Sequence, residues 1–287
     1  MIELRHNPPA EFLQPEVRWG GYEVSARMKQ LWAVQIDMML ELVDVCRQLG
    51  IRIYADGGTM LGAVRHQGYI PWDDDIDMTM LRADYDVLMR EGPALLGEEY
   101  FLQDVNSDPY YRNLHARLRN TRTHCWSIGP HRRRELCNDG IFLDIFPADS
   151  LPGNPRELTR FFKQLRSRRG SYYRTRGLDF RLPRSWYMWL REHGSIWSDK
   201  YEFQRYEELL RSVDPRSSAV TCEVAFRHYA PFFPIELFGT PQMVPFEYTE
   251  IPIMEGAREA LRLQFGENYM QPQQLPSCHN DFDFSVE

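Results

Sequence analysis

Residues 51–80 constrain this chain more than any other stretch, because they place four carboxylates within five positions. These carboxylates are Asp73, Asp74, Asp75 and Asp77. The run that follows, up to Met80, alternates apolar and polar residues, which predicts a strand with one buried face. Residues two apart on a strand point to the same side, so Asp75 and Asp77 would converge. Such a pair repels unless a positive charge lies between its members.

Hard oxygen ligands of this kind favour Mg²⁺ or Mn²⁺, and Mg²⁺ is commonly held by carboxylates together with substrate phosphates. A calcium-binding EF-hand loop starting at Asp73 fits poorly. Its sixth position is Met78, where Gly is needed, and its twelfth is Asp84, where Glu is preferred. An exposed acidic loop also fits poorly, because the carboxylates lie among apolar side chains such as Trp72 and Ile76.

A Gly-Gly-Thr turn precedes the carboxylates, between a β-like run at 51–55 and a short apolar helix at 59–64. Glycines let a backbone approach a ligand closely, and the free N–H groups at a helix start attract phosphate. By itself Gly57-Gly58-Thr59 is a common turn. A phosphate cradle beside a metal-holding carboxylate pair, however, predicts phosphoryl or nucleotidyl transfer.

A second apolar strand, expected at 140–149, contains Asp144 between Ile141-Phe142-Leu143 and Ile145-Phe146. An Asp in such a run is costly if it is buried without a partner. A metal shared with Asp75 and Asp77 would supply that partner. Asp149, which follows Pro147, is expected to cap the next element.

The rest of the sequence contains both helix-like and strand-like segments, which predicts an α+β fold. We expect a basic strand at 113–120, whose Arg117 faces either solvent or a phosphate, and a long amphipathic helix ended by Gly50. The Arg-rich, aromatic region after residue 154 is either a solvated helix face or a wall for substrate. Further helices are expected at 82–90, 155–176, 185–212 and 255–265, with strands at 100–103, 219–225 and 244–253.

Composition sets the broad class. A chain of 287 residues with 43% hydrophobic residues can build a real core, and a net charge of −7 argues against general affinity for nucleic acid. No run is long and apolar enough for a membrane span, and the N-terminus lacks a leader pattern. The five cysteines are widely spread, so a cytoplasmic protein is expected. A zinc site is disfavoured by the spacing of His124, Cys125, His131 and Cys137.

The string GGTMLGAVRHQGYIPWDDDIDM closely resembles the signature of the LicD family of phosphotransferases. That family includes bacterial phosphocholine transferases and fukutin-type ribitol-phosphate transferases, within the nucleotidyltransferase superfamily. The superfamily pattern is a Gly-Gly or Gly-Ser turn followed by Asp-apolar-Asp-apolar, which Asp75-Ile76-Asp77-Met78 fits. The family also shows a similar Asp-Ile-Phe-Pro string, as at Asp144, and a basic strand that favours Arg117.

The resemblance implies a nucleotidyltransferase-like mixed sheet flanked by helices, with an added helical region. We expect an N-terminal arm at 1–24, a catalytic core at 25–150, and an acceptor-side region at 151–287 whose C-terminal strands and helix pack on the core. The catalytic residues and ligands of Mg²⁺ or Mn²⁺ would be Asp75, Asp77 and Asp144. Substrate contacts would come from Gly57, Gly58, Thr59, Arg65, His66, Asp74 and Arg117.

The expected reaction moves a phospho-alcohol, with phosphocholine as the first candidate, from a CDP-linked donor to a sugar hydroxyl. The acceptor would be a glycan or a lipid-linked sugar, so peripheral contact with a membrane is expected. Two alternatives stay open: transfer of a nucleoside monophosphate from an NTP, and a non-catalytic protein that binds nucleotide or glycan on the same fold.

Overall fold

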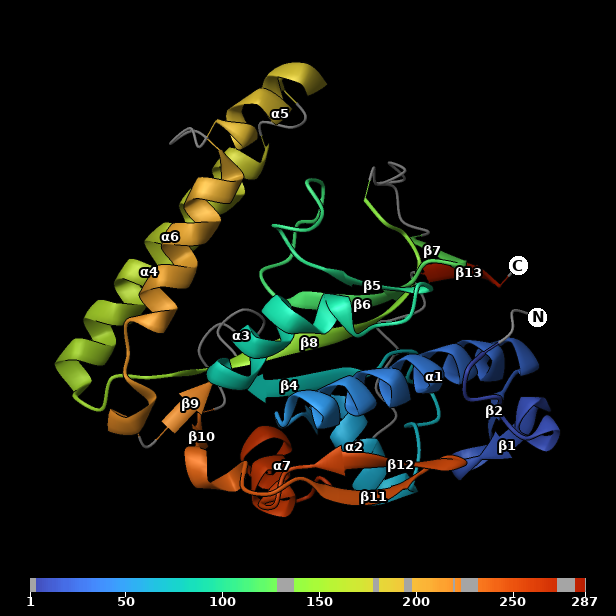
Figure 1. Ribbon diagram of the computed structural model, residues 1–287. Helices are drawn as coiled ribbons and strands as arrows, with labels where there is room; N and C mark the ends of the chain where they lie inside the picture. The colour runs from blue at the N-terminus through green and yellow to red at the C-terminus, as the bar shows by residue number, and fades with distance from the viewer. Residues whose placement is uncertain are drawn as a thin grey trace.

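A mixed β-sheet lies at the centre of the computed structural model, with α1 packed along it (Figure 1). The structure describes residues 4–127, 137–177, 181–193, 198–218, 220–222, 232–272 and 282–286. The α+β class is confirmed by this sheet, in which β4 and β8 are parallel and their other partners antiparallel. Its strands are β3 (Tyr54–Ala55), β4 (Asp77–Leu81), β5 (Tyr100–Gln103), β6 (Ala116–Asn120), β8 (Ile141–Ser150), β9 (Val220–Cys222) and β10 (Phe233–Pro234).

Strand β8 is the organising strand of the sheet. Its residues 141–145 pair with β6 and its residues 144–148 pair with β4, so Asp144 and Ile145 lie between the two strands. Its last two residues pair with β9. All ten of its residues are buried, as expected for a central strand of apolar β-formers. Strand β3 covers only two residues, so the expected strand at 51–55 is shorter than the pattern predicted.

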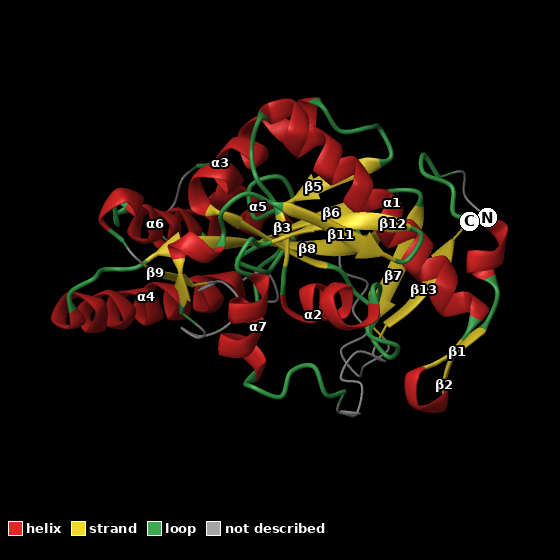
Figure 2. Ribbon diagram, turned by 90° about the horizontal axis from the view of Figure 1, so that it is seen from below, coloured by secondary structure: helices red, strands yellow, loops and turns green. Residues whose placement is uncertain are grey.

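Helix α1 (Ala26–Leu49) follows its sequence signals closely. The Ser25 hydroxyl accepts a hydrogen bond from the Met28 N–H, which caps the first turn, and Gly50 ends the helix with a φ of 67°. Helices α1 and α3 (Arg82–Glu91) lie on one side of the central strands, and α2 (Gly57–His66) and α7 (Ala257–Phe265) lie on the other (Figure 2).

The helical region after β8 has a hydrophobic cluster of its own. Helix α4 (Pro155–Arg176) packs along α6 (Asp199–Arg211), and together they form an arm beside the sheet (Figure 1). The single helix expected at 185–212 is wrong, because α5 (Arg184–Glu192) ends before Ser198 caps α6. By contrast, the hairpin of β11 (Gln242–Phe246) and β12 (Thr249–Ile253) shares the main core with α7.

Two small sheets complete the described structure, and both lie near the chain ends (Figure 1). One pairs β1 (Glu16–Arg18) with β2 (Tyr22–Val24), and the other pairs β7 (Thr123–Ser127) with β13 (Phe282–Val286). The 3₁₀ turns are η1 (Ala10–Leu13), η2 (Trp19–Gly21), η3 (Gly92–Ala94), η5 (Pro215–Ser217) and η6 (Ile235–Leu237). Among the described residues, no helix has the length and apolarity that a membrane span requires.

A buried ion pair network joins the sheet to the arm. The Arg82 guanidinium donates to both carboxylate oxygens of Asp149, at 2.6 and 2.9 Å, and to Glu207 on α6 at 2.9 Å. The expected role of Asp149 as a cap is wrong, because Asn154 caps α4 and the buried Asp149 carboxylate is bound by Arg82. Burial raises the pKa of both carboxyls, and Arg82 opposes that rise.

Changing Arg82 to Met should therefore destabilise the fold by roughly 3–5 kcal/mol, because it leaves the buried Asp149 carboxylate without its cation and leaves Glu207 paired with Arg211 alone. Arg262→Met is the matched control, since Arg262 pairs with Glu259 and Glu267 at the surface, where the loss of an ion pair should change stability little. Urea unfolding at pH 7 measures both. Equal losses in the two variants would contradict a structural role for the network.

Candidate active site

The sheet register brings Asp77 and Asp144 side by side. They are direct partners across the parallel strands β4 and β8, and Arg117 on β6 is the partner of Asp144 from the other side. Directly paired residues of neighbouring strands point to the same face of a sheet. The prediction that Asp144 lies on a strand next to Asp77, on the same side, is therefore confirmed. Its role in catalysis stays a prediction.

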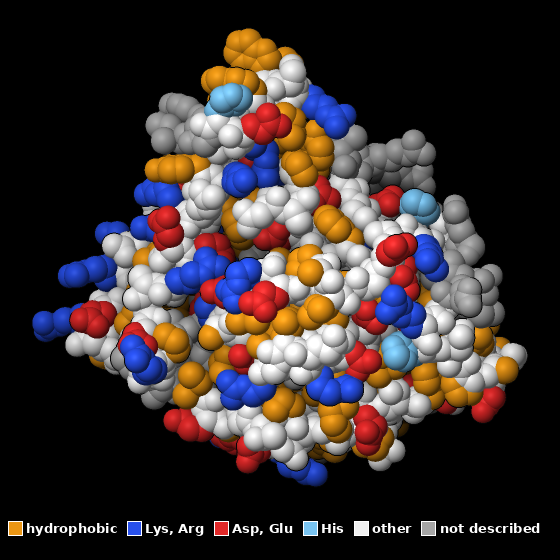
Figure 3. Space-filling model, in the orientation of Figure 1, with side chains coloured by type: hydrophobic (Ala, Val, Ile, Leu, Met, Phe, Trp, Pro, Cys, Tyr) orange, Lys and Arg blue, Asp and Glu red, His pale blue; other side chains and the backbone are white. Residues whose placement is uncertain are grey.

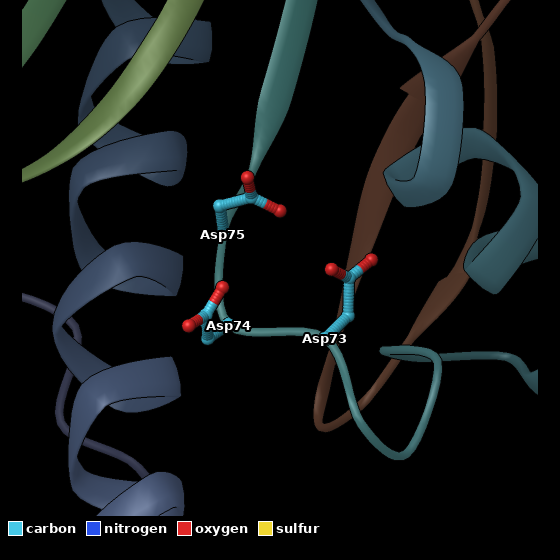
Figure 4. A group of neighbouring side chains, drawn as sticks. All are labelled: Asp73, Asp74 and Asp75. Carbon is cyan, nitrogen blue, oxygen red and sulfur yellow. The ribbon is translucent and has the colours of Figure 1, made fainter. Parts of the chain in front are cut away.

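The acidic loop before β4 forms a tight carboxylate cluster. Asp73, Asp74 and Asp75 each offer an oxygen, and these oxygens lie within 4.8 Å of one another. The carboxylates of Asp73 and Asp75 face a shared space, whereas Asp74 is turned toward α1 (Figure 4). Among the described residues this is the one group of three candidate metal ligands, and His131 of the zinc alternative lies outside them.

Side chains of α1 hold this loop by its backbone. The Trp32 indole N–H donates to the Asp73 carbonyl at 3.0 Å, and the Gln35 amide donates to the Asp74 carbonyl at 2.8 Å. The Tyr69 hydroxyl donates to the Gln35 side chain in turn, at 3.0 Å. The sequence pattern indicated only core packing for this helix. These polar contacts were missed because no local signal marks which buried polar group meets a distant loop.

The packing strongly opposes ionisation of this cluster. Loss of solvent, followed by the charge of Asp75, raises the pKa of Asp73 well above its usual range and that of Asp74 to about 7. Loss of solvent also raises the pKa of Asp77, with further contributions from Asp75, Asp144 and Asp56. Carboxylates crowded in this way suit a divalent cation, which would favour their charged forms. The donor set therefore fits Mg²⁺ or Mn²⁺.

Asp144 differs, because a cation, Arg117, and a histidine lie beside it. The Arg117 Nε donates to Asp144 at 2.5 Å, and the His115 Nε2 lies 3.1 Å from the same oxygen. Burial opposes ionisation of Asp144, but Arg117 and then His115 outweigh it and lower its pKa. The expectation that a buried Asp144 needs a partner is confirmed, but the protein itself supplies Arg117 and His115, and a shared metal stays a prediction. A lowered pKa also makes it a weaker proton acceptor.

His115 is the site residue that the sequence interpretation did not single out. Burial lowers its pKa, and Asp144 partly opposes that change. The alternating pattern of β6 and the residues before it places His115 and Arg117 on the same polar face. That alternation was the available signal, but it did not indicate what either side chain would meet.

The glycine turn begins α2 directly. Gly57 is the first helical residue and has a φ of 50°, a conformation that favours glycine. A Cβ at Gly58 would lie 2.8 Å from the Asp73 Oδ2, so glycine lets the acidic loop approach the helix start. The Thr59 hydroxyl accepts a hydrogen bond from the Asp77 N–H at 2.9 Å. These three residues thus join the start of α2 to the carboxylates.

Replacing Gly58 by Val should displace the Asp73 carboxylate and weaken binding of Mg²⁺ and donor, while the protein stays folded. The matched control is Gly153→Val, because a Cβ at Gly153 meets nothing within 4 Å. Calorimetric titration with CDP-choline and Mg²⁺ measures the effect. Unchanged donor affinity in a folded Gly58→Val protein would count against a ligand site at this turn.

Arg65 and His66 lie in the last turn of α2, at the opposite end from Gly57. Arg65 donates to the Tyr269 carbonyl at 2.8 Å and to the His66 ring at 2.9 Å. Burial, together with Arg65 and Arg18, lowers the pKa of His66 to about 4. The structure therefore does not bring this pair to the carboxylates, and their contact with substrate stays a prediction without structural support.

A largely apolar pocket opens against Asp74 and Asp75. It is formed mainly by α1, β8 and the small sheet of β7 and β13, so the carboxylates have an apolar neighbour on the α1 side. Its other lining residues are Met28, Leu31, Gln35, Cys125, Ile141, Phe142 and Phe284.

Comparison with known proteins shows that the segment containing these residues is similar to a known family. Residues 50–147 match the model of the LicD/FKTN/FKRP nucleotidyltransferase domain. The chain is 32% identical over 128 residues to the lipopolysaccharide cholinephosphotransferase LicD of Haemophilus influenzae, a match covering 42% of this chain and 44% of that protein. It is 42% identical over 43 residues to the ribitol 5-phosphate transferase FKRP of Homo sapiens and of Mus musculus, covering 15% of this chain and 9% of each relative.

The chain thus spans less than half the length of these relatives. The matched segment nevertheless contains the α2 turn, the acidic loop, Arg117 and Asp144. The resemblance drawn from the sequence is confirmed for that segment. Residues 50–147 of this chain are thus similar to the LicD/FKTN/FKRP nucleotidyltransferase domain.

Proposed function

We propose that this protein is a metal-dependent phosphotransferase. It moves a phospho-alcohol, with phosphocholine as the first candidate, from a CDP-linked donor to a sugar hydroxyl of a cell-surface glycan precursor. The observation that carries the proposal is the gathering of the acidic loop, Asp77 and Asp144 at the start of α2, inside the matched domain. The two named relatives are a cholinephosphotransferase and a ribitol 5-phosphate transferase.

In the proposed reaction the acceptor hydroxyl oxygen forms a new bond to the distal phosphorus of the donor. The bond from that phosphorus to the CMP oxygen breaks, and CMP leaves with the electron pair. The hydroxyl proton passes to a carboxylate of the site. Because its pKa is lowered, Asp144 is poorly suited to this role.

Mg²⁺ or Mn²⁺ on Asp75, Asp77 and Asp144 would neutralise the phosphate oxygens and the leaving CMP. The protein's own groups bind the donor and position the carboxylates. The N–H groups at the start of α2 attract the diphosphate. Trp32 and Gln35 hold the acidic loop in place, and Arg117 places a fixed positive charge beside Asp144.

Product analysis tests this proposal against its rivals. The purified protein is incubated with Mg²⁺ and a sugar acceptor, and with CDP-choline, CDP-ribitol or an NTP in separate reactions. Release of CMP together with a phospho-alcohol on the sugar supports the proposal. Release of diphosphate from an NTP, with a nucleotide on the acceptor, would show a nucleotidyltransferase instead.

A non-catalytic binding protein on this fold is the remaining alternative. It would bind nucleotide without releasing CMP from any of these donors.

The proposed location is the cytoplasm, and the free thiols of Cys46, Cys125 and Cys137 are in keeping with a reducing compartment.

A further inference from the structure

Helix α5 continues the arm that α4 and α6 form, and the segment that contains α4 and α5 carries a charge opposite to that of the whole protein. Residues 155–192 contain eleven Lys or Arg and three Asp or Glu, so this segment has a net charge of +8. The whole chain has a net charge of −7, so the rest carries −15. Charge is therefore strongly segregated onto one protruding element of the fold (Figure 1).

The basic residues of α4 form a narrow stripe. Successive residues of a helix turn by about 100°, so Arg156, Arg160, Lys163 and Arg174 fall within roughly 60° of one another. All four are exposed, and they lie opposite the face on which Phe161, Leu165 and Tyr172 are buried. Within the described part of the chain, Arg156, Arg160 and Lys163 form no ion pair.

Helix α5, at the end of the arm, adds an exposed aromatic face. Trp186 is 68% exposed and Trp189 is 55% exposed, and their spacing of three puts them on the same side of the helix. The opposite side is anchored, because Tyr187 and Arg191 are buried and both bond to Asp199, at 2.9 and 2.5 Å. The two tryptophans thus project outward from a helix that is firmly attached.

The two features lie along one edge of the molecule. Figure 3 shows hydrophobic side chains gathered at the end of the arm, over α5, and Lys and Arg side chains following its outer edge below them. A basic surface ending in exposed tryptophans matches the chemistry of an anionic lipid surface. Tryptophan favours the headgroup region, and each basic side chain near such a surface contributes to binding.

We propose that this arm docks the protein on an anionic membrane surface, through the tryptophans of α5 and the basic stripe of α4. The negative charge of the rest of the chain would be repelled by the same lipids, which orients the molecule with the arm toward the membrane. The inference goes beyond the proposed function, because it concerns where the protein binds and does not depend on the reaction.

Sedimentation with vesicles tests the proposal. One set of vesicles contains phosphatidylcholine alone, and the other also contains roughly 30% phosphatidylserine. Neither donor nor acceptor is added. The protein should bind the anionic vesicles and bind the neutral ones weakly. Changing Arg160, Lys163 and Arg174 together to Gln should weaken binding on the order of 100-fold, since each basic residue contributes about fivefold. Trp186→Ala with Trp189→Ala should weaken it about tenfold or more.

Matched controls lie elsewhere on the surface. Changing Arg47, Arg90 and Arg216 to Gln removes the same charge from exposed side chains outside the arm. Met243→Ala with Phe265→Ala removes exposed apolar groups of the hairpin and α7. Both controls should bind vesicles as the unchanged protein does.

Equal binding to neutral and anionic vesicles, or equal losses in the controls, would overturn the proposal. The proposal would also be overturned if the protein formed a stable dimer, bound no vesicles, and became monomeric in the tryptophan variant. The exposed face would then bind a second copy of the chain. Turnover of a soluble acceptor is assayed separately, so failure of the proposed reaction and failure of membrane binding are distinguishable.

Discussion

Changing Asp77 to Asn should reduce phosphotransfer by orders of magnitude while leaving the fold intact. Asp77 lies at the start of β4, between the acidic loop and Asp144, and its N–H is already held by Thr59. Asn keeps the shape of the side chain but removes the charge that a divalent cation would need. Turnover of the CDP-linked donor with Mg²⁺ measures this loss.

The same variant should raise the melting temperature of the metal-free protein at pH 8. The pKa of Asp77 is higher in the folded protein than in the unfolded chain, where it is about 4. Asp77 therefore destabilises the folded state as the pH rises above about 4, and this destabilisation reaches its full size above the folded-state pKa. Lowering the pH from 8 to 5 should therefore shrink the difference between the variant and the unchanged protein, because Asp77 then takes up a proton.

Thr221→Val is a matched control for folding, since Thr221 is buried and far along the sheet, where its hydroxyl bonds to the Asp149 carbonyl. It should lower the melting temperature without the pH dependence expected of Asp77→Asn. Near-normal turnover in Asp77→Asn, or a melting temperature difference that does not change with pH, would contradict the assignment of Asp77.

Asp144→Asn is expected to cost about 10²–10⁴-fold in turnover, the range typical when a catalytic group is lost. Variants of its partner Arg117 can distinguish why activity is lost. If Asp144 acts through the cation, the variant should also bind Mg²⁺ more weakly, whereas Arg117→Gln should not. If Asp144 only holds Arg117, the two single variants and the double variant should lose similar activity, because the pair acts as one unit.

The effect on stability has the opposite pH dependence to that of Asp77. The pKa of Asp144 is lowered in the folded protein, so its contribution is present above the unfolded value of about 4 and is lost as the pH falls toward the folded pKa. Asp144→Asn should therefore destabilise the metal-free protein at pH 7 and at pH 5 alike, as measured by urea unfolding. A destabilisation that disappears between pH 7 and pH 5 would contradict the ion pair.

Several features could be predicted from the sequence because they are local. The cap at Ser25 and the glycine at Gly50 bound α1 where the periodicity indicated. The apolar run around Asp144 predicted a buried strand. The acidic string indicated where carboxylates gather, although it predicted that Asp75 would share a strand with Asp77, whereas Asp75 lies in the loop before β4 and clusters with Asp73 and Asp74. In each case, the residues that define the feature lie within a few positions of one another, so the chain's own spacing determines the result.

Other features were decided only by the tertiary structure. The pairing of Asp144 with Arg117 depends on the register between β6 and β8, and the anchoring of the acidic loop depends on where α1 crosses it. The ion pair of Asp149 with Arg82 joins residues that lie 67 positions apart. Periodicity shows which side chains share a face, but it carries no information about which distant partner they meet. In this protein the tertiary packing determines which groups lie beside each carboxylate, and those groups shift its pKa.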